Sequence, residues 1–501
     1  MISDKINTEV ADETYGSDHF PITIEVDANR FLYHKQTFKL KSVTTDWNHF
    51  LCLLEQNYSK FLTYEYDQLA SPDKYNFFIS IITESLKKTT PCKNNKNNNN
   101  NKNNKTFRNP VSWWDIDCDK IKRIRRASFK KWQFTLSLED LIKYKECCAK
   151  AKKLFKDKKV EYFRNFASSI DFRINHSYVW NKCKILKNKW IKTKNYTPIN
   201  KKEFENKCTN CINKLSPPWA STDCQNFPPG QPNDTLDKPF SYAEFNRVLK
   251  PRKNNSSPGL DGIDYEILQK LPPKFQLLLL DIFNEMYKKG EYPTDWQHSF
   301  VHMIDKPGKN SVRPIALTSC VGKVFEGLVK SRLQWWAEHE NILPKNQAGF
   351  RKGKSCNDNL AYLTLQIDQA LANKKEVLAT FLDVSDAFNN VLPNVLINRL
   401  LELKCSEQVI RFVKFLTFER FIHTNIEGDK TVKKISKGVP QGGVLSPLLY
   451  LLYVSNISNK IDKDTTVLQF ADDLVVYTTT TSREKGKGKL ETSINVIMQT
   501  C

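Results

Sequence analysis

Residues 470–477 read FADDLVVY and place two adjacent aspartates, Asp472 and Asp473, between apolar flanks. The flanking runs, TVLQF and LVVYTT, have the β-branched and aromatic content of two strands. A hairpin turn is therefore the simplest interpretation, although two-residue turns usually contain Asn-Gly or another glycine pair. Two like charges in a partly buried segment repel each other, and a bound divalent cation would remove that repulsion. The stretch by itself leaves both interpretations open.

A third aspartate follows another strand-like run upstream. In EVLATFLDVSDAFNNV (376–391), the run from Val377 to Leu382 is followed by Asp383, and Asp386 lies three residues further on. Alone, an acid at the end of a buried strand is more often a turn former or a helix cap. If this strand neighbours the FADD hairpin in one sheet, three carboxylates converge. Three acids are the minimal cage for two Mg²⁺ ions about 3.5–4 Å apart, the arrangement used for in-line phosphoryl displacement.

A glycine-rich segment, SKGVPQGGVLSPLLYLLYV (436–454), lies between the two acid sites. Gly442 and its neighbouring glycines let the backbone come close to a ligand, and the Gln441 amide can donate to a phosphate or sugar. Ser446-Pro447 then begins an apolar helix. The structural alternative, a glycine-rich loop that simply precedes a core helix, is common. The position of the segment between the two acid sites is what favours a functional role.

Two cations and two further loops lie upstream of the acids. SVRPIALTSCVGKVFEGLVKSRL (311–333) contains Arg313 and Lys323, which close to a carboxylate–metal centre could hold a triphosphate. SPGLDGIDYEIL (257–268) and QAGFRKGKSC (347–356) are glycine-rich and partly basic. These two loops could contact backbone phosphates.

The composition indicates a polyanionic partner. The 501 residues include 77 Lys and Arg against 55 Asp and Glu, a formal charge of +22. Nucleic acid is the leading candidate and an acidic membrane surface the weaker one. The N-terminus lacks a secretory signal and no apolar run is long enough to span a membrane, so we expect no membrane insertion. The 13 cysteines are scattered and odd in number, and without a secretion signal they are expected to be reduced thiols. A zinc site at Cys208, Cys211 and Cys224 is not favoured, because no fourth Cys or His lies nearby with finger spacing.

The N-terminal half divides into segments of different character. The first 26 residues end in a strand-like run, and KNNKNNNNNKNNK (93–105) predicts a disordered insertion. A long helical stretch then runs to about residue 170. Between Lys120 and Val160 it carries 15 Lys and Arg against 4 acids. Interleaved aromatics could pack one face inward while the other contacts phosphate, although a solvated helix face is an equal alternative; these aromatics are Phe129, Trp132, Phe134, Tyr144 and Phe155.

Residues 195–240 are irregular and rich in proline, which makes them the best domain boundary. A helix is predicted to begin after Ser241, with Glu244 at capping-box spacing. Helices and short strands then alternate, the pattern of an α/β or α+β domain.

Taken together, RPIAL, QAGFRKGKS, FLDVSDAF, GVPQGGVLSPLL and FADD stand in an order that resembles the reverse transcriptase of a non-LTR (LINE-type) retrotransposon. The resemblance covers about residues 241–480, with weaker support from SWWDIDC and HSYVWNKCKILK. It implies an α+β right-hand polymerase, with fingers and an antiparallel palm sheet packed by helices. A mainly helical basic linker region over 27–240 would precede fingers and palm over 241–501.

The resemblance implies specific roles for residues of this chain. Asp383 and Asp472 would be the principal metal ligands and Asp473 the third carboxylate, holding two Mg²⁺ ions, with Mn²⁺ as the alternative. Phe388 would exclude the ribose 2′-hydroxyl and so select deoxynucleotides. Four further residues would contact the incoming nucleotide: Gln441 and Gly442 in the glycine-rich loop, and Arg313 and Lys323 at the triphosphate.

Both ends of the chain are expected to be remnants. GSDHFPI resembles the last motif of an apurinic-type endonuclease of the endonuclease/exonuclease/phosphatase type, with Asp18 and His19 as orienting carboxylate and catalytic histidine. Residues 1–26 would be its C-terminal remnant, and no nicking activity is expected without the metal-binding glutamate motif. Only 28 residues follow Asp473, so we expect a chain truncated before the thumb. Asn389, usually Asp, and the second glycine of PQGG, usually Ser, depart from the family pattern at tolerable positions.

The expected activity is RNA-directed DNA polymerisation, in which a DNA primer 3′-hydroxyl is extended with dNTPs on an RNA template, in the service of integration into target DNA. The alternative is a catalytically silent, nucleic-acid-binding relic of a truncated element. An RNA-copying RNA polymerase ranks far behind, because such enzymes lack a bulky residue at the Phe388 position. A retroelement's life cycle predicts nuclear localisation, with the cytoplasm alongside the element RNA as the alternative.

Overall fold

The computed structural model describes residues 6–10, 22–26, 45–90, 113–169, 201–215, 227–254, 256–305, 311–426 and 429–500. The chain divides into two compact units, one made of Met1–Cys92 with Ile199–Cys501 and the other of Lys93–Pro198. The predicted linker region is therefore shared between the two units. The predicted insertion and the residues Asp18 and His19 lie outside the described residues. The strand expected near residue 26 is present as β2 (Ile22–Val26), antiparallel to β1 (Ile6–Val10).

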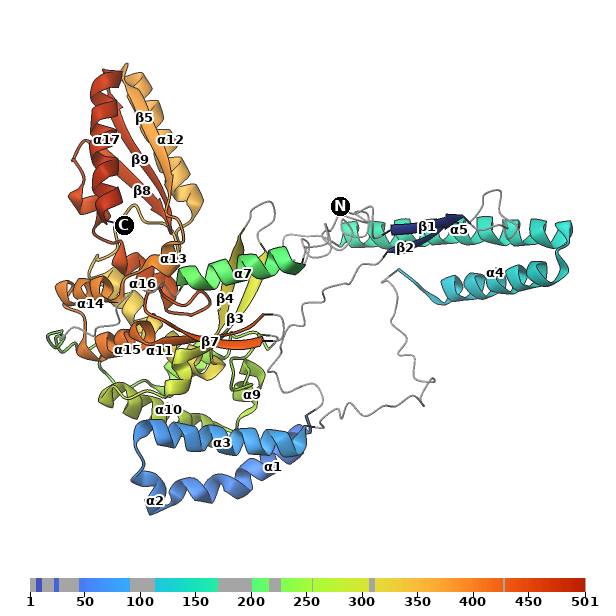
Figure 1. Cartoon of the computed structure of the whole chain (residues 1–501), viewed down its shortest axis with the longest axis horizontal. Helices are drawn as coiled ribbons and strands as arrows, with labels where there is room; N and C mark the ends of the chain where they lie inside the picture. Colours follow the sequence, from blue (N-terminus) through green and yellow to red (C-terminus); the bar gives the residue numbers. More distant parts are fainter. Residues whose placement is uncertain are drawn as a thin grey trace. The chain divides into compact units, whose positions relative to one another are not determined.

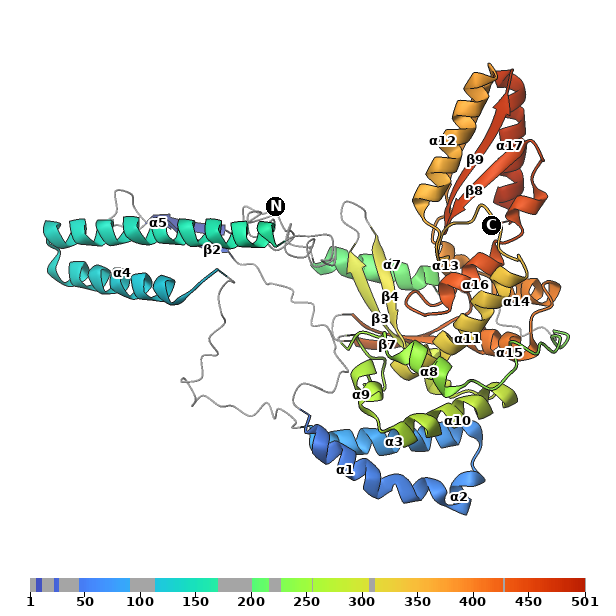
Figure 2. The ribbon, with the colours of Figure 1, turned by 180° about the vertical axis from the view of Figure 1, so that it is seen from behind.

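The elements of the larger unit are shown in Figures 1 and 2. Its helices are α1 (Trp47–Asn57), η3 (Tyr58–Leu62), α2 (Tyr64–Asp67), α3 (Ser71–Thr89), α7 (Lys201–Leu215), α8 (Tyr242–Leu249), α9 (Tyr265–Lys270), α10 (Pro273–Lys289), η4 (Thr294–Gln297), α11 (Cys320–His339), α12 (Cys356–Ala372), α13 (Ala387–Asn390), α14 (Pro393–Glu402), α15 (Glu407–Phe418), α16 (Ser446–Tyr453), η5 (Ile457–Lys460) and α17 (Arg483–Thr500). Its remaining strands are β3 (His298–Asp305), β4 (Val312–Leu317), β5 (Glu376–Asp383), β6 (Arg420–Ile426), β7 (Asp429–Ile435), β8 (Thr465–Phe470) and β9 (Asp473–Thr480). None of the helices in the described part of the chain is both long and apolar enough to cross a bilayer.

Two sheets carry the segments predicted to be functional. A four-stranded sheet has the order β4-β3-β6-β7, in which β3 and β6 are parallel and the outer pairs are antiparallel. A three-stranded antiparallel sheet has the order β5-β9-β8. The second sheet confirms that the strand before Asp383 neighbours the FADD hairpin. Helices α12 and α17 flank this sheet in both views (Figures 1 and 2).

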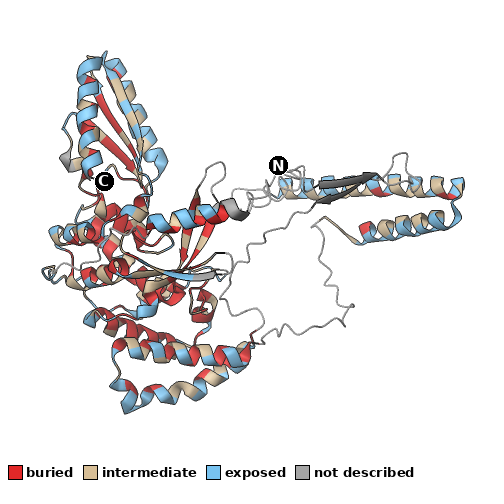
Figure 3. Cartoon of the chain, in the orientation of Figure 1, coloured by how far each residue is buried: buried red, intermediate tan, exposed pale blue. Residues whose placement is uncertain are grey.

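Helices from both sequence segments of the larger unit, Met1–Cys92 and Ile199–Cys501, share one apolar core. Residues 45–90 pack on the later part of the unit: the Tyr75 hydroxyl accepts a hydrogen bond from Trp296 Nε1 at 2.9 Å, and Lys74 pairs with Glu285 at 2.9 Å. The predicted capping box at Ser241 and Glu244 is confirmed at the start of α8. Figure 3 shows the buried residues concentrated in these packed helices and along the sheets.

A second apolar cluster lies between α7 and the four-stranded sheet. Cys208 and Ile212 of α7 pack with Val301, Val312 and Ile422 of the sheet. Cys208 is buried in this cluster, and Cys211 is packed against it. Both cysteines of the Cys-x-x-Cys pair therefore contribute to core packing.

Residues 113–169 form the described part of the smaller unit, a helical hairpin of α4 (Ile116–Thr135) and α5 (Leu138–Ser168). The predicted long helical stretch is confirmed and consists of two helices, because Leu136 adopts a left-handed conformation (φ 50°) that ends α4 and Ser137 begins the next helix. The aromatics meet in the seam, where Trp132 stacks on Tyr144 with ring centroids 5.9 Å apart. Phe134 instead is 92% exposed.

Helix α17 allows a direct test of its packing on the three-stranded sheet. A Cβ at Gly488 would have no atom within 4 Å, whereas a Cβ at Gly486 would lie 2.5 Å from Leu378 Cδ1 and 2.7 Å from Thr480 Cγ2. We expect Gly488→Ala to raise the free energy of unfolding by about 0.5–1 kcal/mol through helix propensity. Gly486→Ala is expected to lower it by about 1–3 kcal/mol through overpacking. Urea denaturation of both variants checks this, and equal shifts of the same sign would contradict the packing.

Candidate active site

The three predicted aspartates meet at one end of the three-stranded sheet. Asp383 is the last residue of β5 and pairs in register with Asp473, the first residue of β9. Asp472 precedes it in the turn, and its carbonyl accepts a long hydrogen bond from Val384 N–H at 3.4 Å. Directly opposite residues of an antiparallel pair have Cβ atoms about 5 Å apart on the same face. The fold therefore brings together residues that are about 90 positions apart in the sequence.

The aspartates occupy a tight hairpin, as the simplest interpretation predicted. Phe470 pairs with Asp473, so Ala471 and Asp472 form the two-residue turn between β8 and β9. Ala471 has φ 59°, a left-handed conformation that costs an L-residue about 1–2 kcal/mol. Such a conformation persists only where its surroundings hold it.

The QAGF segment supplies what holds this turn. Gln347, 1% exposed, accepts hydrogen bonds at Oε1 from Ala471 N–H (3.1 Å) and Gly349 N–H (2.8 Å). Its Nε2 donates to Gln469 Oε1 at 3.2 Å. A backbone hydrogen bond also joins the QAGF segment to β8, since Ala348 N–H donates to the Gln469 carbonyl at 2.9 Å. A Cβ at Gly349 would lie 2.9 Å from Ala471 Cα, so only glycine lets the segment come this close.

One basic residue of the 347–356 loop is occupied within the fold. Arg351 has a buried side chain that pairs with Glu338 and donates to the carbonyls of Pro344 (2.6 Å) and Gln347 (3.1 Å). Phosphate contact by the rest of the loop stays a prediction. The glutamine and glycine of the motif were missed as positioning residues. The sequence alone gives no signal for them, because burial of Gln347 and the close approach of Gly349 to Ala471 appear only in the fold.

The SPGLDG loop also serves the fold. Asp261 Oδ2 accepts a hydrogen bond from the Ser319 hydroxyl at 2.6 Å, and Asp264 caps α9 through Ile267 N–H. Gly259 abuts the backbone of Ser319, where a Cβ would lie 2.8 Å from the Cα. The loop thus anchors the beginning of α11, and its Ser257 lines the cavity described below.

The glycine-rich loop lies against the segment that follows Asp383. Val439 N–H donates to the Phe388 carbonyl at 2.8 Å, and Gly438 N–H donates to the Val391 carbonyl at 2.7 Å. Gln441 Nε2 donates to Asn389 Oδ1 at 3.1 Å. Asn389 therefore supplies an acceptor that an aspartate at this position would also supply, which explains why the departure is tolerable.

Charged side chains on two other elements fix the same loop. Arg420 at the start of β6 is half-buried; desolvation lowers its pKa to about 10, and it donates to the carbonyls of Lys437 and Gly438. Glu326 of α11, 4% exposed, accepts hydrogen bonds at Oε2 from Val444 N–H (2.6 Å) and Leu445 N–H (3.0 Å). A carboxylate at the start of α16 also complements that helix dipole. Neither anchor was anticipated from the sequence.

Burial raises the pKa of Glu326 above its ordinary value of 4.5, although the Leu445 and Val444 N–H groups, Lys323 and Arg252 oppose the shift. Lys330 also faces this carboxyl. The folded state therefore binds the proton of the Glu326 carboxyl more tightly than the unfolded state does. As pH rises above 4.5 and this carboxyl loses its proton, its contribution to the free energy of unfolding falls. Gln at this position keeps an acceptor oxygen without titrating. We therefore expect the stability of wild type relative to Glu326→Gln to fall as pH rises, which urea denaturation between pH 4.5 and 8 would measure. A difference that stays constant with pH would contradict this.

The predicted nucleotide contacts fall in two places. Lys323 and Gly442 line a cavity of about 490 Å³, together with Ser257, Arg252 and Lys253. Gly442 lies against the Ala316 carbonyl, and the Gln441 carbonyl accepts from Ala316 N–H at 2.8 Å. The loop is thereby joined to β4, which carries Arg313.

Arg313 and Phe388 do not line that cavity. Arg313 is exposed on β4. Phe388 stacks on Tyr450 with ring centroids 5.2 Å apart and meets Phe350 edge-on at 6.1 Å. Phe350 follows the QAGF glycine, so Phe388 sits between the segment that holds the aspartate turn and the helix after the glycine-rich loop.

The donor set suits a hard divalent cation. No three acid, His or Cys side chains among the described residues are placed, as they stand, to share one metal ion. The backbone register nevertheless gathers three carboxylates, and Asp383 and Asp473 are exposed and can rotate. Burial, and then the charges of Asp472 and Asp383, raise the pKa of Asp473, so the three acids repel one another. Carboxylate oxygens are the ligands that Mg²⁺ prefers, and a cation would relieve this repulsion.

The mixed α/β fold, with acids gathered at the end of an antiparallel sheet, is compatible with the fingers and palm of a polymerase. Residues 304–501 match the family model described as "Reverse transcriptase (RNA-dependent DNA polymerase)". The match includes the three aspartates, Phe388 and the glycine-rich loop.

Curated relatives are named as RNA-directed DNA polymerases from transposons or mobile elements. The chain is 31% identical over 267 residues to "Probable RNA-directed DNA polymerase from transposon BS" of Drosophila melanogaster, covering 51% of this chain and 29% of the relative. It is 29% identical over 269 residues to "RNA-directed DNA polymerase from mobile element jockey" of the same species, covering 50% and 29%. To "Probable RNA-directed DNA polymerase from transposon X-element", also of that species, it is 31% identical over 246 residues, covering 48% and 27%. The matched region thus spans less than a third of each relative.

Proposed function

We propose that the chain is an RNA-directed DNA polymerase of a non-LTR retrotransposon, which extends a DNA primer with dNTPs on an RNA template. The observation that carries the proposal is the β5–β9 register, which sets Asp383 opposite Asp473 with Asp472 in the adjoining turn, inside a reverse transcriptase domain. The polymerase fold of fingers and palm over residues 241–501 is part of the proposal. An element that copies itself into chromosomal DNA acts in the nucleus, so nuclear localisation is proposed as well.

Asp383, Asp472 and Asp473 would hold two Mg²⁺ ions, or Mn²⁺ in their place. These ions would lower the pKa of the attacking primer hydroxyl and stabilise the leaving pyrophosphate. The chain's own part is to keep the three carboxylates in place, through the turn that Gln347 holds and the sheet register. Preorganised charge of this kind acts without reorganisation during the reaction.

The remaining residues would bind and select the nucleotide. Lys323 and Gly442 share a cavity, and Arg313 extends from the strand joined to the glycine-rich loop, so the cations can contact the triphosphate. Phe388, held between Phe350 and Tyr450, would exclude the ribose 2′-hydroxyl. Gln441, whose amide donates to Asn389, would keep the loop close to the incoming nucleotide.

The charge of the chain supports a nucleic-acid substrate. The hairpin of α4 and α5 alone carries 16 Lys and Arg against 8 acids over residues 113–169. Its aromatics pack in the seam, which leaves most of the basic side chains exposed. A surface of this kind binds phosphates independently of base sequence.

Primer extension by the purified chain tests the proposal. The assay contains an RNA template, an annealed DNA primer, dNTPs and Mg²⁺, with ribonucleotides in a parallel reaction and Asp472→Ala/Asp473→Ala as the control. Extension with dNTPs that the double variant lacks would support the polymerase. Failure to extend, with RNA binding that is retained and weakens with salt, would instead support the silent nucleic-acid-binding relic. Equal use of ribonucleotides would contradict the role of Phe388.

A further inference from the structure

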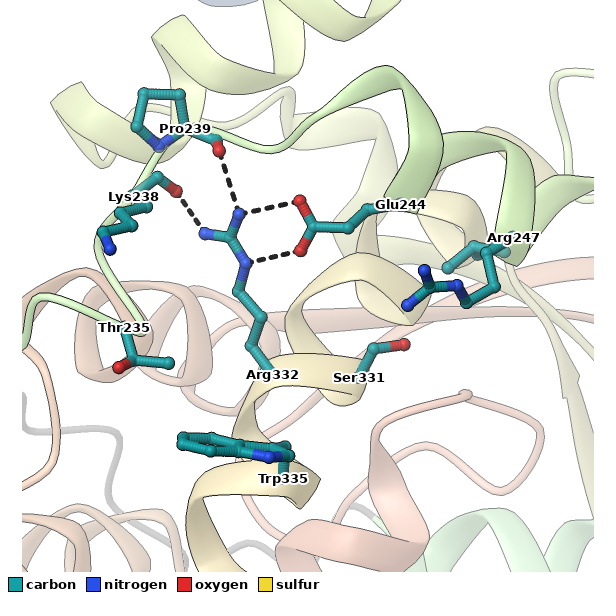
Figure 4. A pocket seen from close by; sticks show the side chains of 9 residues that line it. Thr235, Lys238, Pro239, Glu244, Arg247, Ser331, Arg332 and Trp335 are labelled. Carbon is teal, nitrogen blue, oxygen red and sulfur yellow. Dashed lines mark hydrogen bonds and ion pairs between the residues drawn. The ribbon is translucent and has the colours of Figure 1, made fainter. Parts of the chain in front are cut away.

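A second cavity of about 490 Å³ opens between the segment before α8, α8 itself and the last turns of α11 (Figure 4). Its lining includes Thr235, Lys238, Arg247, Ser331, Arg332 and Trp335. None of the predicted catalytic or nucleotide-contacting residues is among those that line it. Its volume lies within the range of small-molecule pockets, about 300–1,000 Å³.

Trp335 provides an aromatic surface at this cavity. Its side chain is 51% exposed, although tryptophan is normally mostly buried. One face of the indole stacks on His339, one turn further along α11, with ring centroids 4.6 Å apart and an interplanar angle of 20°. Figure 4 shows the indole nearly edge-on beneath the Arg332 side chain, in the lining of the cavity. The ring is thus stacked on His339 while about half of its surface stays exposed.

The charge of the cavity is positive. The Arg332 guanidinium is already engaged within the protein. It pairs with Glu244 at 2.8 and 3.0 Å and donates to the carbonyls of Lys238 and Pro239. This pairing also neutralises Glu244, the only acid in the lining. Lys238 and Arg247 are exposed, and neither has an ion-pair partner among the described residues. The side chains of Lys238 and Arg247 therefore remain unpaired among the described residues, in the same lining as the half-exposed indole of Trp335.

We propose that this cavity binds a nucleotide of a single-stranded nucleic acid, with its base stacked on Trp335 and its phosphates near Lys238 and Arg247. Aromatic platforms beside cations are the physical basis of sequence-tolerant single-strand binding. Trp335 follows Lys323 by 12 residues on α11, which places it about 18 Å further along the helix axis. The site is therefore distinct from the nucleotide-binding cavity and engages the strand away from the site of reaction. The identity of that strand as the RNA template rests on the proposed function.

Equilibrium binding by the full chain, without Mg²⁺, tests this site. Fluorescence anisotropy of a labelled 20-nucleotide oligoadenylate RNA would give Kd for wild type, Trp335→Ala and Trp335→Phe. Stacking contributes roughly 1–3 kcal/mol per base, so Trp335→Ala is expected to raise Kd by roughly 5- to 150-fold, while Trp335→Phe retains most of the affinity. Tyr64→Ala removes an aromatic on α2 that is even more exposed, at 77%, and is the matched control, with no expected change.

A charge variant provides an independent measurement if Trp335→Ala fails to fold. Lys238→Gln/Arg247→Gln is expected to reduce the slope of log K against log salt by about 1.4, or 0.7 for each phosphate lost. Unchanged Kd in Trp335→Ala, or an equal loss in Tyr64→Ala, would overturn the proposal. AMP that quenches Trp335 fluorescence while RNA affinity is independent of Trp335 would also overturn it, and would assign the site to a free nucleotide.

Primer extension by the same preparations separates this proposal from the polymerase activity. If wild type extends the primer but RNA affinity does not depend on Trp335, the strand site is wrong and the proposed function stands. If RNA affinity depends on Trp335 but no extension occurs, the strand site stands and the polymerase proposal fails.

Discussion

Asp383→Asn is expected to reduce RNA-templated primer extension at least about a hundredfold, which corresponds to about 2.7 kcal/mol of transition-state stabilisation. Asp383 faces Asp473 across the β5–β9 pair, so its loss removes one of three negative charges available to the cations. Gel-resolved extension rates at saturating dNTP over a range of Mg²⁺ concentrations would measure the effect. The variant should also need more Mg²⁺ for half-maximal rate.

The matched control is Asp386→Asn, which removes a carboxylate three residues away on the same segment. Asp386 is exposed and has φ 51°, a conformation that asparagine tolerates well, so this change should leave both folding and extension unaltered. Because the three acids repel one another, Asp383→Asn should not lower the melting temperature in the absence of divalent ions. Wild-type extension by Asp383→Asn would exclude the metal-binding role.

Gly349→Ala is expected to lower the free energy of unfolding by about 1–3 kcal/mol and to reduce extension about a hundredfold. The added Cβ would lie 2.9 Å from Ala471 Cα, against backbone that cannot rotate away as a side chain can. Either the QAGF segment or the turn that carries Asp472 must move. A displacement near 1 Å at reacting groups is enough for a loss of this size. Extension should be measured well below the melting temperature, so that loss of folding does not contribute.

Gln347→Ala tests whether the hydrogen bonds of Gln347 hold the turn that carries Asp472. It leaves the buried N–H groups of Ala471 and Gly349 without their acceptor, at a cost of about 1–3 kcal/mol for each group. Gly488→Ala, whose Cβ meets no atom within 4 Å, is the control and should extend normally. If Gly349→Ala and Gln347→Ala both retain wild-type extension, the turn does not depend on this segment.

Local patterns accounted for much of the fold. Alternation and apolar runs predicted β5 and the two strands of the FADD hairpin, and the capping residues predicted where α8 begins. The helical, basic character of residues 113–169 was also predicted. Its division into two helices was not, because a single left-handed residue, Leu136, ends α4 without glycine or proline to mark the place.

The roles of the supporting residues lay beyond local patterns. Arg351 and Lys354 gave the QAGFRKGKSC loop a basic appearance, yet Arg351 is buried against Glu338. Glu326 and Arg420 act on the glycine-rich loop from elements more than 15 residues away in sequence. Burial converts such charges from surface groups into hydrogen-bond anchors, and burial depends on the packed fold.

By itself, the sequence determined the kinds of chemistry available: acids, cations and glycines in a fixed order, strand and helix patterns, and a positive charge suited to nucleic acid. The tertiary structure alone decided which of them meet. The β5–β9 register sets Asp383 beside the FADD turn, and the buried Gln347 amide holds that turn in a left-handed conformation. The physical reason is that periodicity and propensity act over a few residues, whereas register and hydrogen-bond partners are set by contacts between segments distant in the chain.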